Sequence, residues 1–176
     1  MIISLIGYMG SGKSHVSKLL SSQLQLKLID LDQRISFKTG MTIPEIFEKK
    51  GEIYFRKKEK EILEEILASE KSAILSVGGG TPAYYNNMEI IKNKSESFYL
   101  RTSVKTLVDR VSKNKEKRPL IARITDEDLP EFIAKHLFER QTFYAQAKYT
   151  VSTDGKEVQN IVDEIIALLH FPALPH

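Results

Sequence analysis

The chain contains no cysteine among its 176 residues. This absence excludes disulfides, thiolate chemistry and cysteine-based zinc sites, and it fits a reducing cytoplasm. No apolar run approaches the ~20 residues that a membrane-spanning helix needs. The apolar run at the N-terminus has no basic segment before it and is interrupted by Gly7 and Gly10. We therefore expect a soluble, cytoplasmic protein that is neither exported nor held in a membrane.

The chain also has little net charge, and its histidines lack the spacing of metal ligands. A formal charge of +3 is too small to indicate a nucleic-acid partner by itself. Eight basic residues do lie between Arg101 and Arg123, but no aromatic residue is interleaved with them to stack on bases. A compact anion such as ATP is therefore a better partner for this stretch than a polynucleotide, and most of these lysines are expected to be simply solvated.

The strongest motif that is present lies at residues 7–14. An apolar run over residues 2–6 predicts a buried strand, and the following Gly-Tyr-Met-Gly-Ser-Gly-Lys-Ser matches G-x-x-x-x-G-K-[ST] at every fixed position. In such a P-loop, backbone N–H groups and the N-terminus of the next helix surround a phosphate. Lys13 would reach the β- and γ-phosphates, and Ser14 would provide one oxygen ligand to Mg²⁺. The alternative, a glycine-rich turn that binds nothing, does not explain the amphipathic pattern that follows.

Apolar runs and helical patterns alternate along the chain, which predicts an α/β fold with a three-layer architecture: a parallel sheet of five strands with helices on both faces. The predicted strands are Ile2–Ile6, Leu26–Ile29, Ala73–Val77, Ser97–Leu100 and Tyr149–Ser152. The predicted helices are His15–Leu24, Asp32–Phe37, Ile43–Lys49, Ile53–Ala68, Met88–Lys92, Val104–Val111, Leu129–Gln146 and Val158–Leu169. Ligands of such sheets bind at the carboxyl ends of the strands.

Two acidic residues, Asp30 and Asp32, follow the second predicted strand. Their spacing lets both side chains project from the sheet edge that carries the P-loop. One carboxylate would serve the metal, and the other would orient a hydroxyl and accept its proton during phosphoryl transfer. The alternative is that Asp32 only caps the next helix.

Two further segments indicate a substrate site. Arg56 and Glu59 are three residues apart on one helix face, and the flanking Phe47 and Phe55 suit an arginine that binds a carboxylate on a carbon ring better than a surface ion pair. Three consecutive glycines, at 78–80, exceed what a tight turn needs and allow a substrate to lie against bare backbone.

The remaining organisation is simple. Residues 1–170 are expected to form one domain that acts as a monomer, with substrate-binding helices over about 32–61. The polar stretch 113–125 has few apolar anchors and is expected to be a mobile lid, and residues 171–176, with two prolines, are expected to form a loose tail.

Together these motifs resemble the shikimate kinase family over residues 2 to about 169. The resemblance rests on the P-loop, Asp30-x-Asp32, Phe55-Arg56-x-x-Glu59, Gly78-Gly79-Gly80, Arg118-Pro119-Leu120 and Glu139-Arg140-x-x-x-Tyr144, in that order. It implies a P-loop kinase related in architecture to nucleoside-monophosphate kinases. It also implies transfer of the γ-phosphoryl group of MgATP to the 3-hydroxyl of shikimate, a step in aromatic amino-acid biosynthesis.

The resemblance assigns roles to individual positions, with Arg118 swinging in from the lid and Arg110 lying against adenine. The residues implied in catalysis are Lys13, Asp32 and Arg118. Those implied in ATP binding are Gly10, Ser11, Gly12, Lys13, Ser14, His15, Arg110 and Arg118. Those implied in shikimate binding are Asp32, Arg56, Gly78, Gly79, Gly80 and Arg140. The implied metal residues, for Mg²⁺, are Ser14 and Asp30.

One loop differs from the family pattern, and two other classes of P-loop protein share some of these motifs. Family members often have a proline in the adenine loop, whereas residues 152–157 read Ser-Thr-Asp-Gly-Lys-Glu. A regulatory GTPase needs D-x-x-G, which the chain lacks, and the N-K-x-D-like residues 93–96 precede a strand instead of following one. Another small-molecule kinase, for example for gluconate, shares the P-loop and lid. The set Asp32, Arg56, Gly78–Gly80 and Arg140 discriminates against both.

Overall fold

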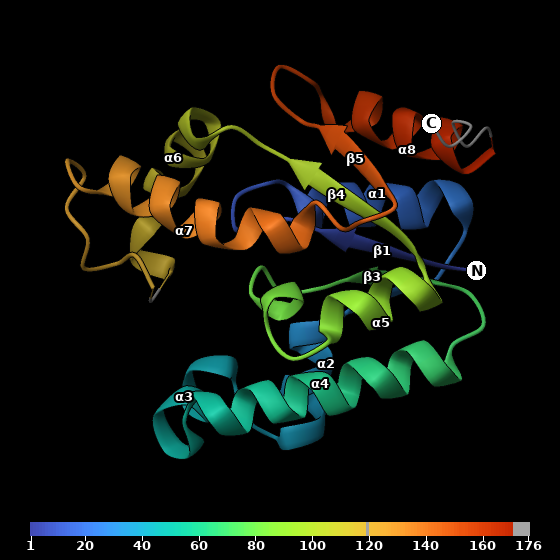
Figure 1. Cartoon of the computed structure of the whole chain (residues 1–176), viewed down its shortest axis with the longest axis horizontal. Coiled ribbons are helices and arrows are strands. Elements are labelled where there is room, and N and C mark those ends of the chain that lie inside the picture. Colours follow the sequence, from blue (N-terminus) through green and yellow to red (C-terminus); the bar gives the residue numbers. More distant parts are fainter. Residues whose placement is uncertain (119, 171–176) are drawn as a thin grey trace.

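The computed structural model describes residues 1–118 and 120–170, so the expected tail at 171–176 lies outside the described residues. Five strands form one parallel sheet in the order β2-β3-β1-β4-β5 (Figure 1). The strands are β1 (Ile2–Ile6), β2 (Leu28–Asp30), β3 (Ala73–Ser76), β4 (Glu96–Arg101) and β5 (Tyr149–Ser152). The predicted fold class is therefore confirmed.

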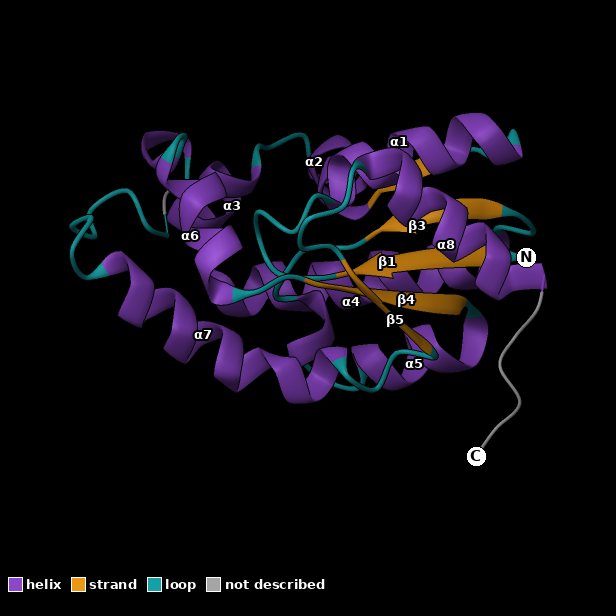
Figure 2. Cartoon of the chain, turned by 90° about the horizontal axis from the view of Figure 1, so that it is seen from above, coloured by secondary structure: helices purple, strands orange, loops and turns teal. Residues whose placement is uncertain are grey.

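Helices cover both faces of this sheet because successive residues of the buried strands point to opposite sides. Ile3 and Leu5 of β1 pack with α1 and α8, whereas Ile2 and Ile6 belong to the core on the other face. Figures 1 and 2 show α1 and α8 together on one side of the sheet, with α4 and α5 on the other. The helices are α1 (Lys13–Leu24), α2 (Leu31–Thr39), α3 (Ile43–Lys50), α4 (Glu52–Ser69), α5 (Asn87–Lys94), α6 (Val104–Ser112), α7 (Leu129–Tyr144) and α8 (Val158–His170).

Two short 3₁₀ helices, η1 (Thr81–Ala83) and η2 (Lys115–Lys117), complete the described elements. Strand β2 begins two residues later than the apolar pattern predicts. The backbone N–H of Leu26 donates to Ser21 O, and Ser21 Oγ donates to Leu26 O, so Leu26 still closes the end of α1. Within residues 1–118 and 120–170, no helix is both long and apolar enough to cross a membrane.

The register of the three central strands brings the motif-bearing loops to one edge. Leu5 pairs with Ser76 across β1 and β3, and Ser76 pairs with Asp30 across β3 and β2. The P-loop after β1, the glycines after β3 and the two aspartates at the end of β2 therefore emerge side by side, at the carboxyl end of the sheet.

Candidate active site

The P-loop has the backbone conformation that its glycines permit. Gly10 has a φ of 82°, in the left-handed region, and a Cβ there would lie 2.8 Å from Val111 Cγ1. The ammonium of Lys13 donates to the carbonyl oxygens of Gly7 at 2.5 Å and Tyr8 at 3.1 Å. Ser11 is buried, and its hydroxyl oxygen has no hydrogen-bond partner among the described residues. A buried polar atom without a partner inside a phosphate loop fits a loop that awaits an anion.

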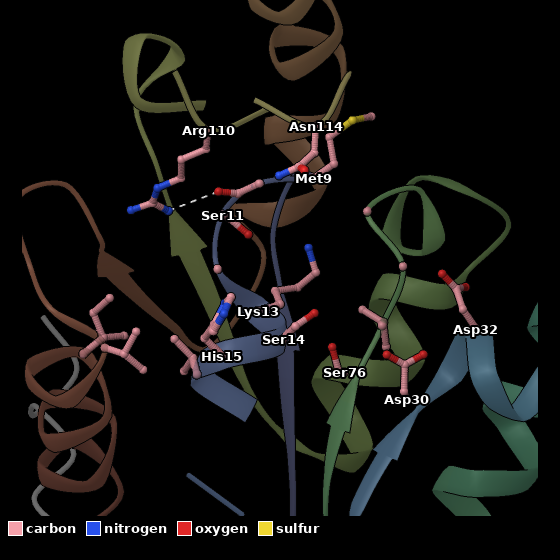
Figure 3. Close-up of a pocket in the computed structure, with 18 of the residues that line it drawn as sticks. Met9, Ser11, Lys13, Ser14, His15, Asp30, Asp32, Ser76, Arg110 and Asn114 are labelled. Atoms are coloured by element: carbon pink, nitrogen blue, oxygen red, sulfur yellow. Dashed lines mark hydrogen bonds between the residues drawn. The ribbon is translucent and has the colours of Figure 1, made fainter. Parts of the chain in front are cut away.

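A cavity of about 540 Å³ opens above this loop. Figure 3 shows Lys13 and Ser14 near the centre of the site with His15 beside Ser14, Arg110 toward the upper left, and Asp30 and Asp32 on the opposite side. Its walls come from the P-loop, the end of β2, the loop after β3, α6, the lid segment and the start of α8: Met9–Val16, Asp30, Asp32, Ser76–Gly79, Arg110, Asn114, Arg118, Lys156, Val158 and Ile161.

Burial perturbs the two ionisable groups that face each other across the cavity. It lowers the pKa of Lys13 to about 8, although the nearby Asp32 acts in the opposite direction. It raises the pKa of Asp32 to about 6, and the charges of Asp30 and Glu59 raise it further, against the opposing effect of Lys13 and Arg56. Asp32 is therefore largely ionised at neutral pH yet close enough to titration to accept a proton.

The residue that caps α2 is Asp30 and not Asp32. Asp30, the last residue of β2, is the N-cap of α2, and its Oδ1 accepts from the backbone N–H of Gln33 at 3.0 Å. Asp32 lies in the first turn of α2. The hypothesis that Asp32 is the cap is therefore wrong, because the helix begins one residue earlier than predicted. The Asp32 carboxylate is not the cap of α2, and it lines the cavity.

Arg56 lies on α4 in an aromatic and acidic environment. Its Nη1 donates to Glu59 Oε1 at 3.0 Å, and the second oxygen of this buried carboxylate accepts from Thr81 Oγ1 at 2.8 Å. The guanidinium carbon lies 5.0 Å from the Phe55 ring centre and 3.8 Å from that of Tyr84. Tyr84, which was not predicted from the sequence, provides the closer aromatic face. Phe47, which was expected to flank the arginine, packs against Phe55.

The three glycines after β3 touch each of the predicted substrate residues. A Cβ on Gly78 would lie 3.3 Å from Asp32 Oδ1, one on Gly79 would lie 3.6 Å from Arg140 Nη1, and one on Gly80 would lie 2.9 Å from both terminal nitrogens of Arg56. The absence of side chains here therefore lets a carboxylate and two guanidinium groups, from α2, α4 and α7, approach a single loop.

The segment 113–125, which we expect to be a lid, contributes Arg118 to the cavity, and the Nε of this arginine is buried without a hydrogen-bond partner among the described residues. The segment is better anchored than its composition indicates. Ile121 is 0% exposed and belongs to the main core, and Lys115 Nζ donates to Ile124 O at 2.6 Å. The expectation of few apolar anchors missed Ile121 and Ile124, because two isoleucines in a polar stretch are too few to give an extended periodic signal.

Further polar residues line the cavity. Arg110 Nη1 donates to Gly10 O at 3.1 Å, and the lining residue His15 is exposed. Asn114 and Lys156 also line the cavity, and neither was singled out from the sequence. Lys156 lies in the loop that lacks the expected proline, so it is the residue that this loop places at the cavity.

Comparisons with known proteins point to one family. Residues 9–170 match the family model described as "Shikimate kinase". The shikimate kinases of Flavobacterium psychrophilum and Flavobacterium johnsoniae are 47% and 45% identical, each over 95% of this chain and 98% of the relative. The crystal structure of the Bacteroides thetaiotaomicron shikimate kinase superposes with a TM-score of 0.89 at 32% identity, covering 97% of this chain and 99% of that one.

A structure of the Acinetobacter baumannii shikimate kinase in complex with shikimate superposes with a TM-score of 0.86 at 33% identity. It covers 99% of this chain and 95% of that one.

Proposed function

This chain belongs to the shikimate kinase family, and we propose that its P-loop cavity is where the γ-phosphoryl group of ATP passes to the 3-hydroxyl of shikimate. It is an ATP-dependent kinase that acts on shikimate in the biosynthesis of aromatic amino acids. The observation that carries the proposal is the glycine loop 78–80. Asp32, Arg56 and Arg140 all border this loop, and Asp32 and Lys13 line one cavity.

The nucleotide would lie along the P-loop. Backbone N–H groups of residues 10–15 and the Ser11 hydroxyl would hold the phosphates, with the Lys13 ammonium at the β- and γ-phosphates. Negative phosphate oxygens would restore the Lys13 charge that burial disfavours. Arg110 and His15, which also line the cavity, would lie near the base and ribose.

The donor set suits Mg²⁺. The Ser14 hydroxyl and the Asp30 carboxylate are hard oxygen ligands that line the same cavity from opposite sides, and Asp30 commits only Oδ1 to its helix cap. No group of three or more acidic or histidine side chains able to hold a metal is found in residues 1–118 and 120–170. Phosphate oxygens and water would therefore complete the octahedron. When bound, Mg²⁺ neutralises phosphate charge and aligns the terminal phosphates.

Shikimate has one carboxylate and several hydroxyls, so its orientation can be fixed by cations at one end and an acid at the other. Arg56 and Arg140 would pair with the carboxylate through their forked N–H groups, and Tyr84 would hold Arg56 flat. Gly79 and Gly80 would admit the ring against bare backbone. Asp32 would then lie on the side of the reacting hydroxyl, near the phosphates.

In the transfer step, the shikimate hydroxyl oxygen bonds to the γ-phosphorus as the bond to the β-phosphate oxygen breaks. Asp32 orients this hydroxyl and takes its proton, for which a pKa near 6 is suited. Lys13 and Arg118 would balance the charge that develops on the transferring phosphoryl group. The buried, unpartnered Nε of Arg118 is consistent with a side chain whose partner is a ligand.

The test is a direct measurement of ADP formed from ATP with shikimate, gluconate or AMP as acceptor, with the phosphorylated product identified by mass. Shikimate alone should support turnover, and turnover should require Mg²⁺. A Lys13→Ala preparation, purified in the same way, controls for contaminating kinases. Turnover with gluconate or AMP instead would transfer the fold to another small-molecule kinase and overturn the substrate assignment.

The remaining parts of the proposal are a single domain over residues 1–170, a monomeric state and a cytoplasmic location. One continuous five-stranded sheet supports the first. Cooperative thermal unfolding, sedimentation and cell fractionation would test the three in turn.

A further inference from the structure

Helix α7 presents a row of polar side chains at four-residue intervals. His136, Arg140 and Tyr144 are spaced so that they share one face of the helix. Arg140, in the middle, borders the glycine loop. The residues one turn before and one turn after it each bond to a different loop of the active site.

The first bond joins α7 to the P-loop. The hydroxyl of Tyr8 lies 2.8 Å from His136 Nδ1, and the two rings meet edge to face with centres 5.3 Å apart. Tyr8 is 1% exposed although it stands inside the phosphate-binding motif. Burial raises the pKa of Tyr8 to about 12, and burial together with Arg140 lowers the pKa of His136. A protonated hydroxyl and a neutral imidazole therefore make this bond in either ring tautomer.

The second bond joins α7 to the glycine loop. Tyr144 Oη donates to the carbonyl oxygen of Gly79 at 2.5 Å. Gly79 itself packs against the P-loop, since a Cβ there would lie 3.5 Å from both Gly7 O and Met9 N. Hydrogen bonds one turn before and one turn after Arg140 therefore connect α7 to the P-loop, the first directly and the second through Gly79.

We propose that Tyr8 and His136 are a positioning pair that fixes the distance between the phosphate-binding loop and Arg140. The proposal rests on the function proposed above, in which Arg140 holds the shikimate carboxylate. Phosphate and shikimate are then held by separate elements, and reacting atoms must come within about 3–3.5 Å of each other. A hydrogen bond between those elements fixes the distance between the two bound substrates, although neither Tyr8 nor His136 touches the reacting atoms.

Removing the hydroxyl alone tests the pair. Tyr8→Phe keeps the buried ring and its edge contact but deletes the bond to His136. We expect kcat/KM for shikimate to fall by about 3–10-fold, the usual effect of one neutral hydrogen bond. The Kd for MgATP should stay within twofold, because the P-loop amides and Lys13 are unchanged. Tyr149→Phe is the matched control, since its ring stacks on Phe98 in the core on the other sheet face.

Rescue separates positioning from packing. In His136→Asn, the amide group lies near the position of Nδ1 and can still bond to Tyr8, whereas His136→Leu fills space without a polar atom. Asn should keep kcat/KM for shikimate within about twofold of the wild type, and Leu should reproduce the Tyr8→Phe loss. In the double variant Tyr8→Phe/His136→Leu, the loss should equal that of either single change, because the two side chains act as one unit.

Several results would overturn the positioning pair. They are a Tyr8→Phe enzyme with wild-type kcat/KM for shikimate, an equal loss for shikimate and MgATP, or additive losses in the double variant. Melting temperatures of each variant show whether a loss reflects unfolding, and the His136→Asn comparison decides the case if Tyr8→Phe is unstable. A wild-type protein inactive on shikimate would instead overturn the proposed function, so the two failures are distinguishable.

Discussion

Replacing Asp32 with Asn should make the enzyme more stable and much slower. The carboxylate lies in the first turn of α2, and burial, Asp30 and Glu59 raise its pKa from 3.8 to about 6. A folded-state pKa above the unfolded value means that the ionised form opposes folding. The favourable contribution of the protonated group is complete below pH 3.8 and is lost as the pH rises through about 6.

The size of this effect follows from the shift. About two pKa units correspond to roughly 3 kcal/mol of unfavourable free energy at pH 8, falling to roughly half of that at pH 5. Asn has nearly the same shape and carries no charge, so it removes this cost. For a chain of this length, the melting temperature should rise by about 6–12 °C at pH 8, and by less at pH 5.

Activity should change in the opposite direction. Asn can hydrogen-bond the shikimate hydroxyl but cannot accept its proton, so kcat should fall by ~10², at the lower end of the range for a general base because phosphoryl transfer requires little early deprotonation. The wild-type kcat/KM for shikimate should decline below about pH 6, where Asp32 becomes protonated, and this acid limb should disappear in Asp32→Asn.

Chromatographic measurement of ADP between pH 5 and 9 avoids coupling enzymes, and calorimetry at pH 5 and 8 gives the stability difference. A variant with wild-type kcat would leave positioning by the arginines and Mg²⁺ as the whole of the catalysis. An unchanged melting temperature at both pH values would show that the Asp32 carboxylate is not desolvated in the folded protein.

Four further predictions concern the arginines and the expected lid. Arg140→Ala should raise the KM for shikimate by a factor equivalent to roughly 2–4 kcal/mol with little change in MgATP binding, whereas a loss confined to ATP would reverse the substrate ends. Arg56→Ala should do the same and also lower the melting temperature, because Glu59, 1% exposed, loses its charged partner. Arg118→Ala should reduce kcat far more than shikimate binding, as steady-state kinetics and calorimetric titration would show. Trypsin should cut the 113–125 segment in the free enzyme, and an MgATP analogue plus shikimate should suppress this cleavage. Equal cleavage with and without ligands would count against a lid. Ile121→Ala should accelerate cleavage of the free enzyme.

Much of the fold is predictable because its signals are local. The alternation of apolar runs with helical patterns places every strand and helix, and parallel pairing then follows from the lengths of the connections. Errors occur where a side chain or backbone group is shared between elements. Leu26 looks like part of a strand, but its backbone bonds to Ser21 at the end of α1. The apolar pattern contains no information about that turn.

The candidate site divides in the same way. Residues that act through a contiguous motif, such as Lys13 and Ser14, can be identified because the motif itself specifies their geometry. Contacts between distant segments cannot. Tyr84 lies over Arg56 from a different loop, and Tyr8 meets His136 across 128 residues of sequence. Tyrosine and histidine are common enough that neither position is distinctive until the fold brings the two together.

The charges of the cavity explain why these long-range contacts matter for function. Lys13 and Asp32 are each held in the environment that disfavours its charged form, and Arg118 has a buried nitrogen without a partner among the described residues. Such a site is electrostatically incomplete, and it would relax if its walls could move. The hydrogen bonds between Tyr8 and His136 and between Tyr144 and Gly79 do not involve these charged groups, and they oppose that relaxation. On the proposed function, the phosphates would supply partners for Lys13 and Arg118, and the shikimate hydroxyl would supply one for Asp32. We therefore expect the binding of both substrates to stabilise an arrangement that the free protein maintains at a cost.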